Sequence, residues 1–323
     1  MSGYKKDFKL GSLTLPNNIF YAPLAGCSDY PFRKMTSHYK PGLIFCEMVM
    51  MEALVRDVKD TKTILDYDPS MHPIGAQLCG PRPNSAKTAA KIIEDLGFDV
   101  LDLNCGCPVD RITKDGSGSG MLKNPELIGE VLQTMIEAVD IPVTVKIRAG
   151  WDSESINAPE VTKIAEQVGA KAITIHGRTR KQGYQGYSDR DVIKECKQMA
   201  KDILVIGNGD VMDFSSAKDL FDHTDCDGIL VARGTMGKPW IIQEIIAGYE
   251  NRKAPEFFLE DVKKELLKHY RLIMDYRSEK RAMLDMKRVG CYYLKEFSGV
   301  KAIRKELNKI TCPEQAIQII ENI

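Results

Sequence analysis

One segment near the middle of the chain ends a strand-like run with side chains that can do chemistry. Residues 100–108 read Val-Leu-Asp-Leu-Asn-Cys-Gly-Cys-Pro. The apolar start predicts a short buried strand, and Pro108 cannot extend it because proline has no N–H group for a β-ladder. Asn104 and Cys107 therefore stand together at the strand end. An amide donates and accepts hydrogen bonds, and a thiol can act as nucleophile, metal ligand or proton donor, so the pair suits chemistry on a flat polar ligand.

The two cysteines of this segment, Cys105 and Cys107, do not predict a metal site. Zinc or an iron–sulfur cluster needs further soft ligands at a suitable spacing, and the sequence offers none. A redox pair is disfavoured as well, because its usual spacing is Cys-x-x-Cys. We therefore expect no metal and interpret Cys107 as a lone reactive thiol. Seven further cysteines are interpreted as small buried apolar side chains: Cys27, Cys46, Cys79, Cys196, Cys226, Cys291 and Cys312.

The elements that position this corner form a repeating pattern of strand, polar loop and amphipathic helix. The predicted strands are residues 19–24, 43–48, 74–78, 100–104, 143–147, 172–176, 204–207 and 228–231. Their near-continuous apolar runs are typical of parallel strands covered on both faces. Eight strand–helix units within about 230 residues predict an α/β fold, a (β/α)8 TIM barrel. A doubly wound sheet is the alternative fold, although it usually needs fewer strands.

Local signals mark the ends of this barrel. An alternating segment at about residues 8–18, with Gly11 at its turn, predicts an N-terminal hairpin. Asn124 followed by Pro125 is typical of a helix start, and an apolar stripe continues to Val139. Similar helices are predicted at residues 83–96, 158–168 and 213–221.

The pattern changes after about residue 250. Residues 254–256 read as a linker, and no strand-like run follows. We expect three or four helices, at roughly residues 259–276, 279–296, 299–308 and 313–322. This divides the chain into a barrel domain, residues 1–250, and an all-helical C-terminal domain, residues 251–323. From Trp240 onward there are 16 basic and 13 acidic residues, against 29 and 32 before it, so the tail is the better candidate for an anionic partner. A helical cap packed on the barrel would fit the same charges.

Composition excludes several classes of protein. The formal net charge is zero, so any nucleic acid must be met by local basic patches. No apolar run approaches the roughly 18 residues that a membrane span needs, and the polar N-terminus predicts no signal peptide. Nine scattered cysteines, an odd number, favour a reducing compartment over a disulfide framework. We expect a cytoplasmic monomer without a membrane partner.

Functional groups in such barrels sit at the C-terminal ends of the strands. Loops after the seventh and eighth strands often bind a phosphate, and the glycines there, Gly207, Gly209 and Gly234, would let the backbone approach it. Tight turns alone would also explain them. Lys146 ends the fifth strand, where its ammonium could stabilise a flavin anion or a phosphate, or form a salt bridge. Gln77 could bond a flavin edge or be a satisfied buried amide.

Read in order, these strand ends resemble the tRNA-dihydrouridine synthase family, and most closely its bacterial B-type branch. The matching stretches are residues 22–29 with 31–33, Leu-Asn-Cys-Gly-Cys-Pro at 103–108, Val-Lys-Ile-Arg-Ala-Gly-Trp at 145–151, Ile-His-Gly-Arg-Thr-Arg at 175–180, Gly-Asn-Gly-Asp at 207–210, and Ala-Arg-Gly at 232–234 with Gly237 and 239–240. The resemblance covers nearly the whole chain. One departure is Met-Lys-Arg-Val at residues 286–289, where the branch often has Met-Arg-Lys-His.

The resemblance implies a flavoprotein that reduces one uridine of tRNA to 5,6-dihydrouridine with FMN as cofactor and NADPH as electron donor. It implies that Cys107 is the proton donor and that the helical domain helps to hold tRNA. The residues implied to hold FMN are Pro23, Leu24, Ala25, Gln77, Lys146, His176, Asn208, Gly209, Asp210, Ala232, Arg233 and Gly234. Those implied to face the uracil or the tRNA are Asn104, Arg178, Arg180, Lys287 and Arg288.

The reaction expected on this basis is a hydride transfer followed by a protonation. Reduced FMN delivers hydride from N5 to C6 of the uracil, and Cys107 protonates C5. A thiol, with an ordinary pKa of about 8.5, is mostly protonated at neutral pH and can donate that proton. The uridine must leave its stack to be reached, at a cost of a few kcal/mol. Phosphate contacts along the basic tail could offset that cost.

Three other interpretations are compatible with the same residues. The barrel could be an FMN oxidoreductase acting on a free pyrimidine or another small enone. It could be a non-catalytic RNA-binding barrel that has lost flavin, although the set of Cys107, Lys146 and His176 argues against this. It could be a metal-free aldolase-type barrel in which Lys146 forms a Schiff base. Flavin colour and activity on free uracil discriminate among these interpretations.

Overall fold

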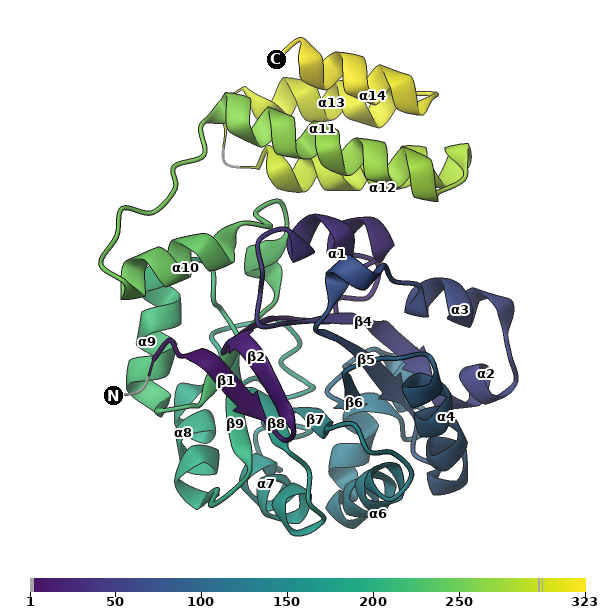
Figure 1. Cartoon of the computed structure of the whole chain (residues 1–323), viewed down its shortest axis with the longest axis vertical. Coiled ribbons are helices and arrows are strands. Elements are labelled where there is room, and N and C mark those ends of the chain that lie inside the picture. The colour runs from purple at the N-terminus through teal and green to yellow at the C-terminus, as the bar shows by residue number, and fades with distance from the viewer. Residues whose placement is uncertain (1–2, 296, 298) are drawn as a thin grey trace.

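The computed structural model describes residues 3–295, 297 and 299–323. Eight parallel strands close into a barrel in the order β10-β3-β4-β5-β6-β7-β8-β9 (Figure 1). They are β3 (Ile19–Tyr21), β4 (Leu43–Met50), β5 (Ile74–Cys79), β6 (Val100–Cys105), β7 (Val143–Arg148), β8 (Ala172–His176), β9 (Leu204–Asn208) and β10 (Gly228–Val231). The predicted TIM barrel is therefore confirmed. β3 ends before residue 24 because Pro23 has no N–H group with which to extend the ladder.

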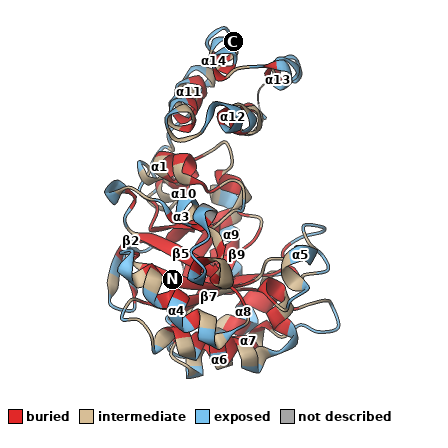
Figure 2. Ribbon diagram, turned by 90° about the vertical axis from the view of Figure 1, so that its right-hand side faces the viewer, coloured by how far each residue is buried: buried red, intermediate tan, exposed pale blue. Residues whose placement is uncertain are grey.

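Helices surround the barrel, and among them are the four that the sequence predicts, at residues 83–96, 125–139, 158–168 and 213–221. They are α1 (Tyr30–Ser37), α2 (Met51–Val55), α3 (Lys59–Leu65), α4 (Pro83–Asp95), α5 (Asp110–Thr113), α6 (Pro125–Ile136), α7 (Ala158–Gln167), α8 (Arg190–Met199), α9 (Phe214–Thr224) and α10 (Ile241–Tyr249), with short 3-10 helices η1 (Pro69–Met71), η2 (Gly118–Lys123) and η3 (Arg233–Thr235). Asn124 caps α6 by accepting from the N–H of Leu127. Figure 2 shows buried residues concentrated in the strands and exposed residues on the outer helices.

An antiparallel hairpin closes the bottom of the barrel. Its strands are β1 (Lys6–Leu10) and β2 (Leu13–Asn17). Gly11, at φ +58°, turns beside Pro142 and Lys171, which precede β7 and β8. The hairpin side chains Phe8 and Leu10 belong to one buried cluster with strand residues that fill the barrel's lower interior. The opposite end, where the strands finish, remains available for a site.

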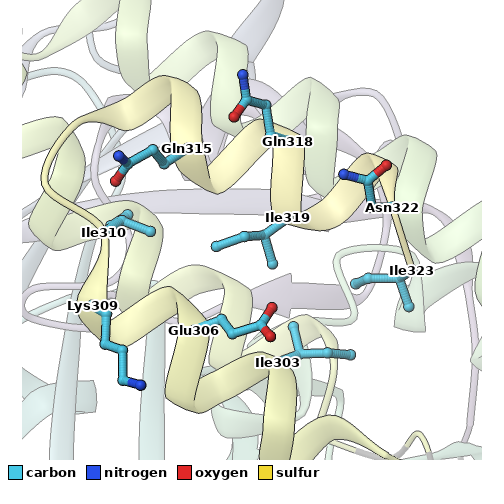
Figure 3. Close-up of a pocket in the computed structure, with 9 residues that line it drawn as sticks. All are labelled: Ile303, Glu306, Lys309, Ile310, Gln315, Gln318, Ile319, Asn322 and Ile323. Atoms are coloured by element: carbon cyan, nitrogen blue, oxygen red, sulfur yellow. The ribbon is translucent and has the colours of Figure 1, made fainter.

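The tail is a stack of four helices above the barrel (Figure 1). They are α11 (Leu259–Tyr276), α12 (Glu279–Tyr293), α13 (Val300–Lys309) and α14 (Pro313–Glu321). The predicted end of the second tail helix, residue 296, lies outside the described residues. The tail packs around its own apolar cluster, which includes Leu266, Tyr270 and Met286. A hollow of about 470 Å³ lies between α13 and α14, and its lining includes Ile303, Glu306 and Lys309 of α13 and Ile319 of α14 (Figure 3).

Several contacts join the tail to α1 and its flanking residues, and three of them involve polar or stacked groups. Arg277, which follows α11, donates to Asp29 at 2.8 Å, and Asp29 caps the start of α1. The rings of Tyr30 and Tyr276 stack with centroids 4.4 Å apart. The hydroxyl of Tyr39 donates to Glu265 at 2.7 Å. No helix in the ranges described above is long and apolar enough to cross a membrane.

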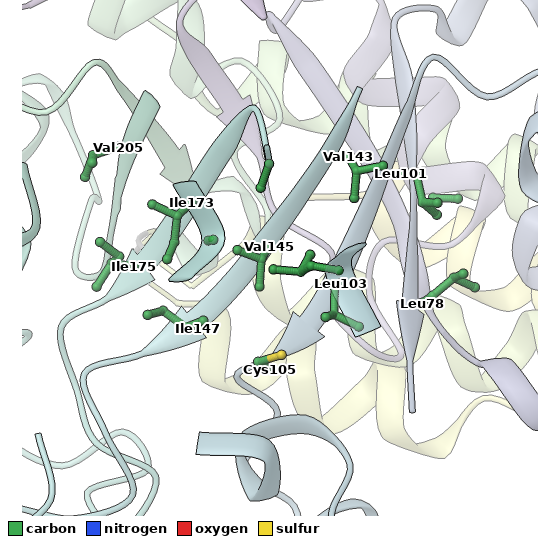
Figure 4. Packing of buried hydrophobic residues seen from close by; sticks show 14 of the residues in the cluster. Leu78, Leu101, Leu103, Cys105, Val143, Val145, Ile147, Ile173, Ile175 and Val205 are labelled. Atoms are coloured by element: carbon green, nitrogen blue, oxygen red, sulfur yellow. The ribbon is translucent and has the colours of Figure 1, made fainter. Parts of the chain in front are cut away.

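Apolar side chains that point outward alternate with polar side chains that point inward along several of the barrel strands. On β6 and β7, apolar residues such as Leu103 and Val145 pack outward in the cluster that the surrounding helices complete (Figure 4). Successive residues of a strand point to opposite faces, so the intervening side chains face the barrel interior. On β5 to β9 these inward residues are mostly polar: Gln77, Asp102, Asn104, Thr144, Lys146, Arg148, Thr174, His176 and Asn208. The sequence thus builds a polar layer above the apolar plug.

Candidate active site

A cavity of about 450 Å³ opens at the C-terminal ends of the barrel strands. That volume is within the range of small-molecule sites, roughly 300–1,000 Å³. Asn104 and Cys107 line it. Eleven of the twelve residues proposed from the sequence for the cofactor also line it: Pro23, Leu24, Ala25, Gln77, Lys146, His176, Asn208, Gly209, Asp210, Ala232 and Arg233. The structure therefore brings most of the predicted site residues together.

The loop after β6 holds Cys107 from both sides. Oδ1 of Asn104 accepts hydrogen bonds from the N–H groups of Gly106 and Cys107, at 3.1 and 2.9 Å. The carbonyl oxygen of Cys107 accepts from the N–H and the hydroxyl of Ser119, at 3.1 and 2.8 Å. Nδ2 of Asn104 donates to Oε1 of Gln77 at 2.7 Å. The amide oxygen of Asn104 is thus committed to the loop, and its nitrogen is the atom with donor capacity toward the cavity.

A cation lies in the centre of the polar layer. Nζ of Lys146 donates to Oδ1 of Asn208 at 3.0 Å, and Nδ2 of Asn208 donates to the carbonyl oxygen of Leu230 at 2.7 Å. Burial, and then the nearby Arg148, lower the pKa of Lys146 to about 8, while Asp102 opposes this shift. Lys146 is therefore mostly protonated at neutral pH.

His176 is a neutral ring that faces the same cavity. Its burial, followed by the positive charges of Lys146, Arg148 and other cations, holds its pKa well below the ordinary value. Nη1 of Arg178 lies 3.3 Å from Nε2 of His176. A guanidinium can only donate, so Nε2 is the acceptor and the ring proton resides on Nδ1.

Arg178, which was expected to face the uracil, lies outside the cavity. Its side chain is 2% exposed and does not line the cavity. It binds both carboxylate oxygens of Asp210, at 2.9 and 2.8 Å. Asp210 also accepts from Arg233 at 2.8 Å, and these cations, Arg178 first, hold its pKa below the ordinary value against the effect of burial. Arg178 and Asp210 thus orient Arg233, which reaches the cavity.

The glycines of the last two strand ends are explained by packing within the protein. A Cβ atom on Gly207 would meet Leu220 and Cys226, on its outer side. One on Gly209 would clash with Oγ of Ser188, and one on Gly234 would clash with the carbonyl oxygen of Val211. Gly234 is the one residue of the proposed cofactor set that does not line the cavity. Close approach to a phosphate is therefore not needed to explain these glycines.

Arg148 and Tyr184 are two of the cavity residues that the sequence-based set did not include. Arg148 donates to the carbonyl oxygens of Gly106, Thr179 and Gly183, at 2.9, 2.9 and 2.8 Å, so it ties the loop after β6 to the loop after β8. Its guanidinium, like that of Arg233, lies over the ring of Tyr184. Arg148 could have been found from the sequence, because it stands two residues after Lys146 and so faces the same side of the strand. Tyr184 lies in an irregular loop and carried no such signal.

Arg180, Lys287 and Arg288, which were proposed for tRNA, do not line the cavity. Arg180 pairs with Asp110 and lies 4.5 Å from the ring centroid of Trp151. Lys287 and Arg288 both lie on α12. Lys287 donates to the carbonyl oxygen of Asn308, and Arg288 pairs with Asp285. A Cβ atom on Gly26 would lie 3.4 Å from Nη1 of Arg288. Arg288 therefore approaches the loop whose residues Ala25 and Cys27 line the cavity.

Potential metal ligands do not cluster around the cavity or elsewhere in the described chain. Within the part of the chain that the structure describes, no group of three or more His, Cys, Asp or Glu residues is arranged to hold a metal ion. The cysteines are all free thiols, and Cys107 is only partly buried.

Comparison with known proteins shows the family of the chain. A family model described as Dihydrouridine synthase (Dus) matches residues 20–323. The chain belongs to the dihydrouridine synthase family. The matched residues include both the barrel and the tail, so membership of the family does not rest on the barrel alone.

Individual relatives match over most of their length. The chain is 37% identical to a probable tRNA-dihydrouridine synthase of Rickettsia bellii, over 88% of each chain. It is 34% identical to tRNA-dihydrouridine synthase B of Pasteurella multocida, over 97% of this chain and 94% of that one. The second of these names agrees with the resemblance to the B-type branch.

Solved structures share the fold at low identity. Histamine dehydrogenase from Rhizobium sp. 4-9 has a TM-score of 0.57 and 15% identity, over 82% of this chain and 50% of that one. A variant of NCR from Zymomonas mobilis has a TM-score of 0.52 and 18% identity, over 79% of this chain and 93% of that one. Identities this low show the fold alone.

Proposed function

We propose that this protein is a tRNA-dihydrouridine synthase, which binds FMN in the barrel cavity, takes electrons from NADPH and reduces a uridine of tRNA to 5,6-dihydrouridine. The observation that carries the proposal is the convergence of Asn104, Cys107 and Lys146 on one cavity, in a chain of the dihydrouridine synthase family. An amide, a thiol and a cation are the groups that this reduction requires of the protein.

The residues that line the cavity fit a flavin phosphate and ring. Many barrels bind phosphate between the loops after the last two strands and the start of a short extra helix. Here the loop after β9, with Gly209 at φ +124°, adjoins η3, and Arg233 begins that helix. The first N–H groups of a helix have no acceptor within it. The protonated Lys146 and the neutral His176 would then face the ring, together with Gln77 and the apolar Pro23 and Leu24.

When bound there, reduced FMN supplies the hydride that C6 of the uracil accepts. Cys107 then holds the proton that C5 requires, because a thiol is a general acid at neutral pH. Nδ2 of Asn104 donates to Oε1 of Gln77 with one N–H, and its other N–H contacts Sδ of Met48 at 3.6 Å. Sulfur is a weak acceptor, so this second N–H is the donor that we assign to a uracil carbonyl oxygen. Lys146 and Arg148 favour the negative charge that develops on the base.

We propose further that residues 251–323 form a separate domain that holds the tRNA. Its helix α12 presents Arg288 beside the loop that lines the cavity mouth. The exposed lysines of α13, Lys301 and Lys305, extend positive charge away from the mouth. Contacts between such cations and phosphates are salt-sensitive and could offset the few kcal/mol needed to turn a uridine out of its stack.

The test uses the full-length protein. Purified protein should be yellow and release FMN on denaturation, and with NADPH it should form dihydrouridine in tRNA isolated from a strain that lacks the gene. Free uracil and uridine should not react. Reduction of free uracil at a comparable rate would favour the small-enone interpretation, and a colourless protein trapped by borohydride at Lys146 would favour the aldolase interpretation. Comparing the rates of flavin reduction by NADPH and NADH identifies the preferred electron donor, and mapping dihydrouridine in the product identifies the tRNA position that is modified.

A further inference from the structure

A buried carboxylate, Asp102, lies in the polar layer beneath the cavity and was not singled out from the sequence. It is 1% exposed, stands on the inward face of β6 and does not line the cavity. Its register partners are Gln77 on β5 and Thr144 on β7. Burying a carboxylate is costly unless hydrogen bonds satisfy it. The bonds that Asp102 makes with its neighbours therefore decide what it does in the site.

Asp102 begins a continuous run of hydrogen bonds. Oδ1 accepts from the hydroxyl of Thr144 at 2.6 Å, and Oδ2 accepts from Nε2 of Gln77 at 2.7 Å. Oε1 of Gln77 accepts from Nδ2 of Asn104 at 2.7 Å. Oδ1 of Asn104 then accepts from the N–H of Cys107 at 2.9 Å. The run therefore links a carboxylate that touches nothing in the cavity to the backbone of the proposed proton donor.

The direction of every bond in this run is set by its ends. A carboxylate only accepts, so Gln77 must turn its nitrogen toward Asp102 and its oxygen toward Asn104. Backbone N–H groups only donate, so Asn104 must turn its oxygen toward the loop. Both ends impose the same orientation on the two amides. Without Asp102, the Gln77 amide could rotate by half a turn and present its nitrogen to the nitrogen of Asn104, which would break the run.

We propose that Asp102 is a positioning residue: it holds the amides of Gln77 and Asn104 in one orientation and thereby fixes the loop that carries Cys107. The consequence for chemistry, a thiol held ready for C5 of the base, rests on the proposed function. The hydrogen-bond run itself does not, so the two can fail separately.

Exchanging the carboxylate of Asp102 and the amide of Gln77 tests whether this run of hydrogen bonds holds the loop. Gln77→Glu sets two carboxylates against each other and breaks the link to Asp102. Asp102→Asn removes the end that accepts with both oxygens. The double variant Asp102→Asn/Gln77→Glu restores every bond, because the new amide nitrogen donates to the new carboxylate, whose other oxygen still accepts from Asn104. The readout is the rate at which iodoacetamide alkylates Cys107, followed by mass spectrometry of its peptide, in the full-length chain with and without FMN.

We expect each single variant to raise the alkylation rate of Cys107 by about tenfold. This is about the factor by which the loss of one hydrogen bond shifts the equilibrium between a closed and an open loop. The double variant should return to within about twofold of the unaltered chain, the non-additivity of a coupled pair. Wild-type rates in the single variants, or rates in the double variant that combine both increases, would overturn the proposal. If a single variant fails to fold, Gln77→Met replaces it, since it removes both bonds of that side chain at similar length. An unchanged rate in that variant overturns the proposal equally.

Thr162→Val is the matched control. Its hydroxyl donates to the carbonyl oxygen of Ala158 within α7, and the residue is 1% exposed. Removing it should lower thermal stability without altering alkylation of Cys107. A second readout separates positioning from general damage: flavin reduction by NADPH should be preserved in Asp102→Asn, while reoxidation by tRNA slows. If tRNA is never reduced but the double variant rescues alkylation, the positioning role stands and the proposed function falls.

Discussion

Nζ of Lys146 on β7 donates to Oδ1 of Asn208 on β9 across 3.0 Å, so the two side chains span the intervening strand β8. Burial lowers the pKa of Lys146 from 10.5 to about 8. The ammonium is therefore present below pH about 8 and is lost as the pH rises through that value. A ligand that is stabilised by this cation must bind less tightly at the higher pH.

The first prediction concerns this cation. FMN affinity, measured by quenching of flavin fluorescence, should fall as the pH rises from about 7 to about 9, the range in which a group with a pKa near 8 loses its proton. Lys146→Met should weaken binding by about tenfold or more at neutral pH and flatten the pH dependence. Lys194→Met, on the exposed face of α8, is the control and should match the unaltered protein. A pH dependence that persists in Lys146→Met would contradict the assignment.

The second prediction concerns the proton donor. Cys107→Ala should leave FMN binding and flavin reduction by NADPH intact, while dihydrouridine formation falls by about 100-fold or more, the range of general acid catalysis. Cys312→Ser, at the start of α14, should change neither step. Measurement of both half-reactions by stopped-flow absorbance separates them. Unchanged turnover in Cys107→Ala would refute the acid role.

The third prediction concerns the tail. Lys287→Gln/Arg288→Gln should weaken tRNA binding and reduce the slope of log affinity against log salt by about 0.9 for each phosphate that the protein no longer neutralises. Asp285 retains Arg277 and Arg281 in this variant, so the tail should stay docked. The control pair Lys87→Gln/Lys91→Gln, exposed on α4, should keep the slope. Filter binding over a series of salt concentrations measures both slopes. An unchanged slope in Lys287→Gln/Arg288→Gln would mean that the RNA binds to another part of the protein.

The fourth prediction concerns the joint between tail and barrel. Asp29 and Asp285 have side chains only 8% and 3% exposed, and Arg277 pairs with both. Arg277→Met leaves Asp29 without its cation and should lower the free energy of unfolding by about 3 kcal/mol, as expected when one partner of a buried pair is removed. The pair of the exposed Arg252 and Glu250 offers the comparison, where Arg252→Gln should lower the free energy of unfolding by much less than Arg277→Met does. Urea titration of the full chain distinguishes the two.

The fifth prediction concerns Asp102. Burial raises its pKa from 3.8 to about 6, against the opposing effects of Thr144, Gln77 and Lys146. The folded state therefore holds this proton more tightly than the unfolded state, a stabilisation that is present at low pH and lost as the pH rises through about 6. Asparagine does not titrate, so Asp102→Asn lacks this loss. The free energy of unfolding of Asp102→Asn minus that of the unaltered protein should therefore rise by about 3 kcal/mol as the pH increases from about 4 to about 7, which is the free energy that corresponds to this pKa difference. Urea titration of both proteins across this pH range measures it, and a difference that is constant with pH would contradict it.

Local patterns in the sequence were sufficient for the elements of the fold. Apolar runs marked the strands, and Asn124 before Pro125 marked the start of α6, because caps and strand runs are properties of a few neighbouring residues. The order of strand ends was also sufficient to bring Cys107, Lys146 and His176 to one place, since the C-terminal ends of all barrel strands meet at one mouth.

Pairing between strands distant in sequence was decided only by the tertiary structure. Arg178 was expected to face uracil, yet closure of the barrel brings Asp210 within bidentate reach, and the guanidinium of Arg178 is buried against that carboxylate. Asp102 carried no signal of its own, because its meaning comes from the register that sets it between Gln77 and Thr144. The sequence alone determines which residues reach the mouth of the barrel. Which of their polar atoms remain available there depends on donors and acceptors that only the closed barrel brings together.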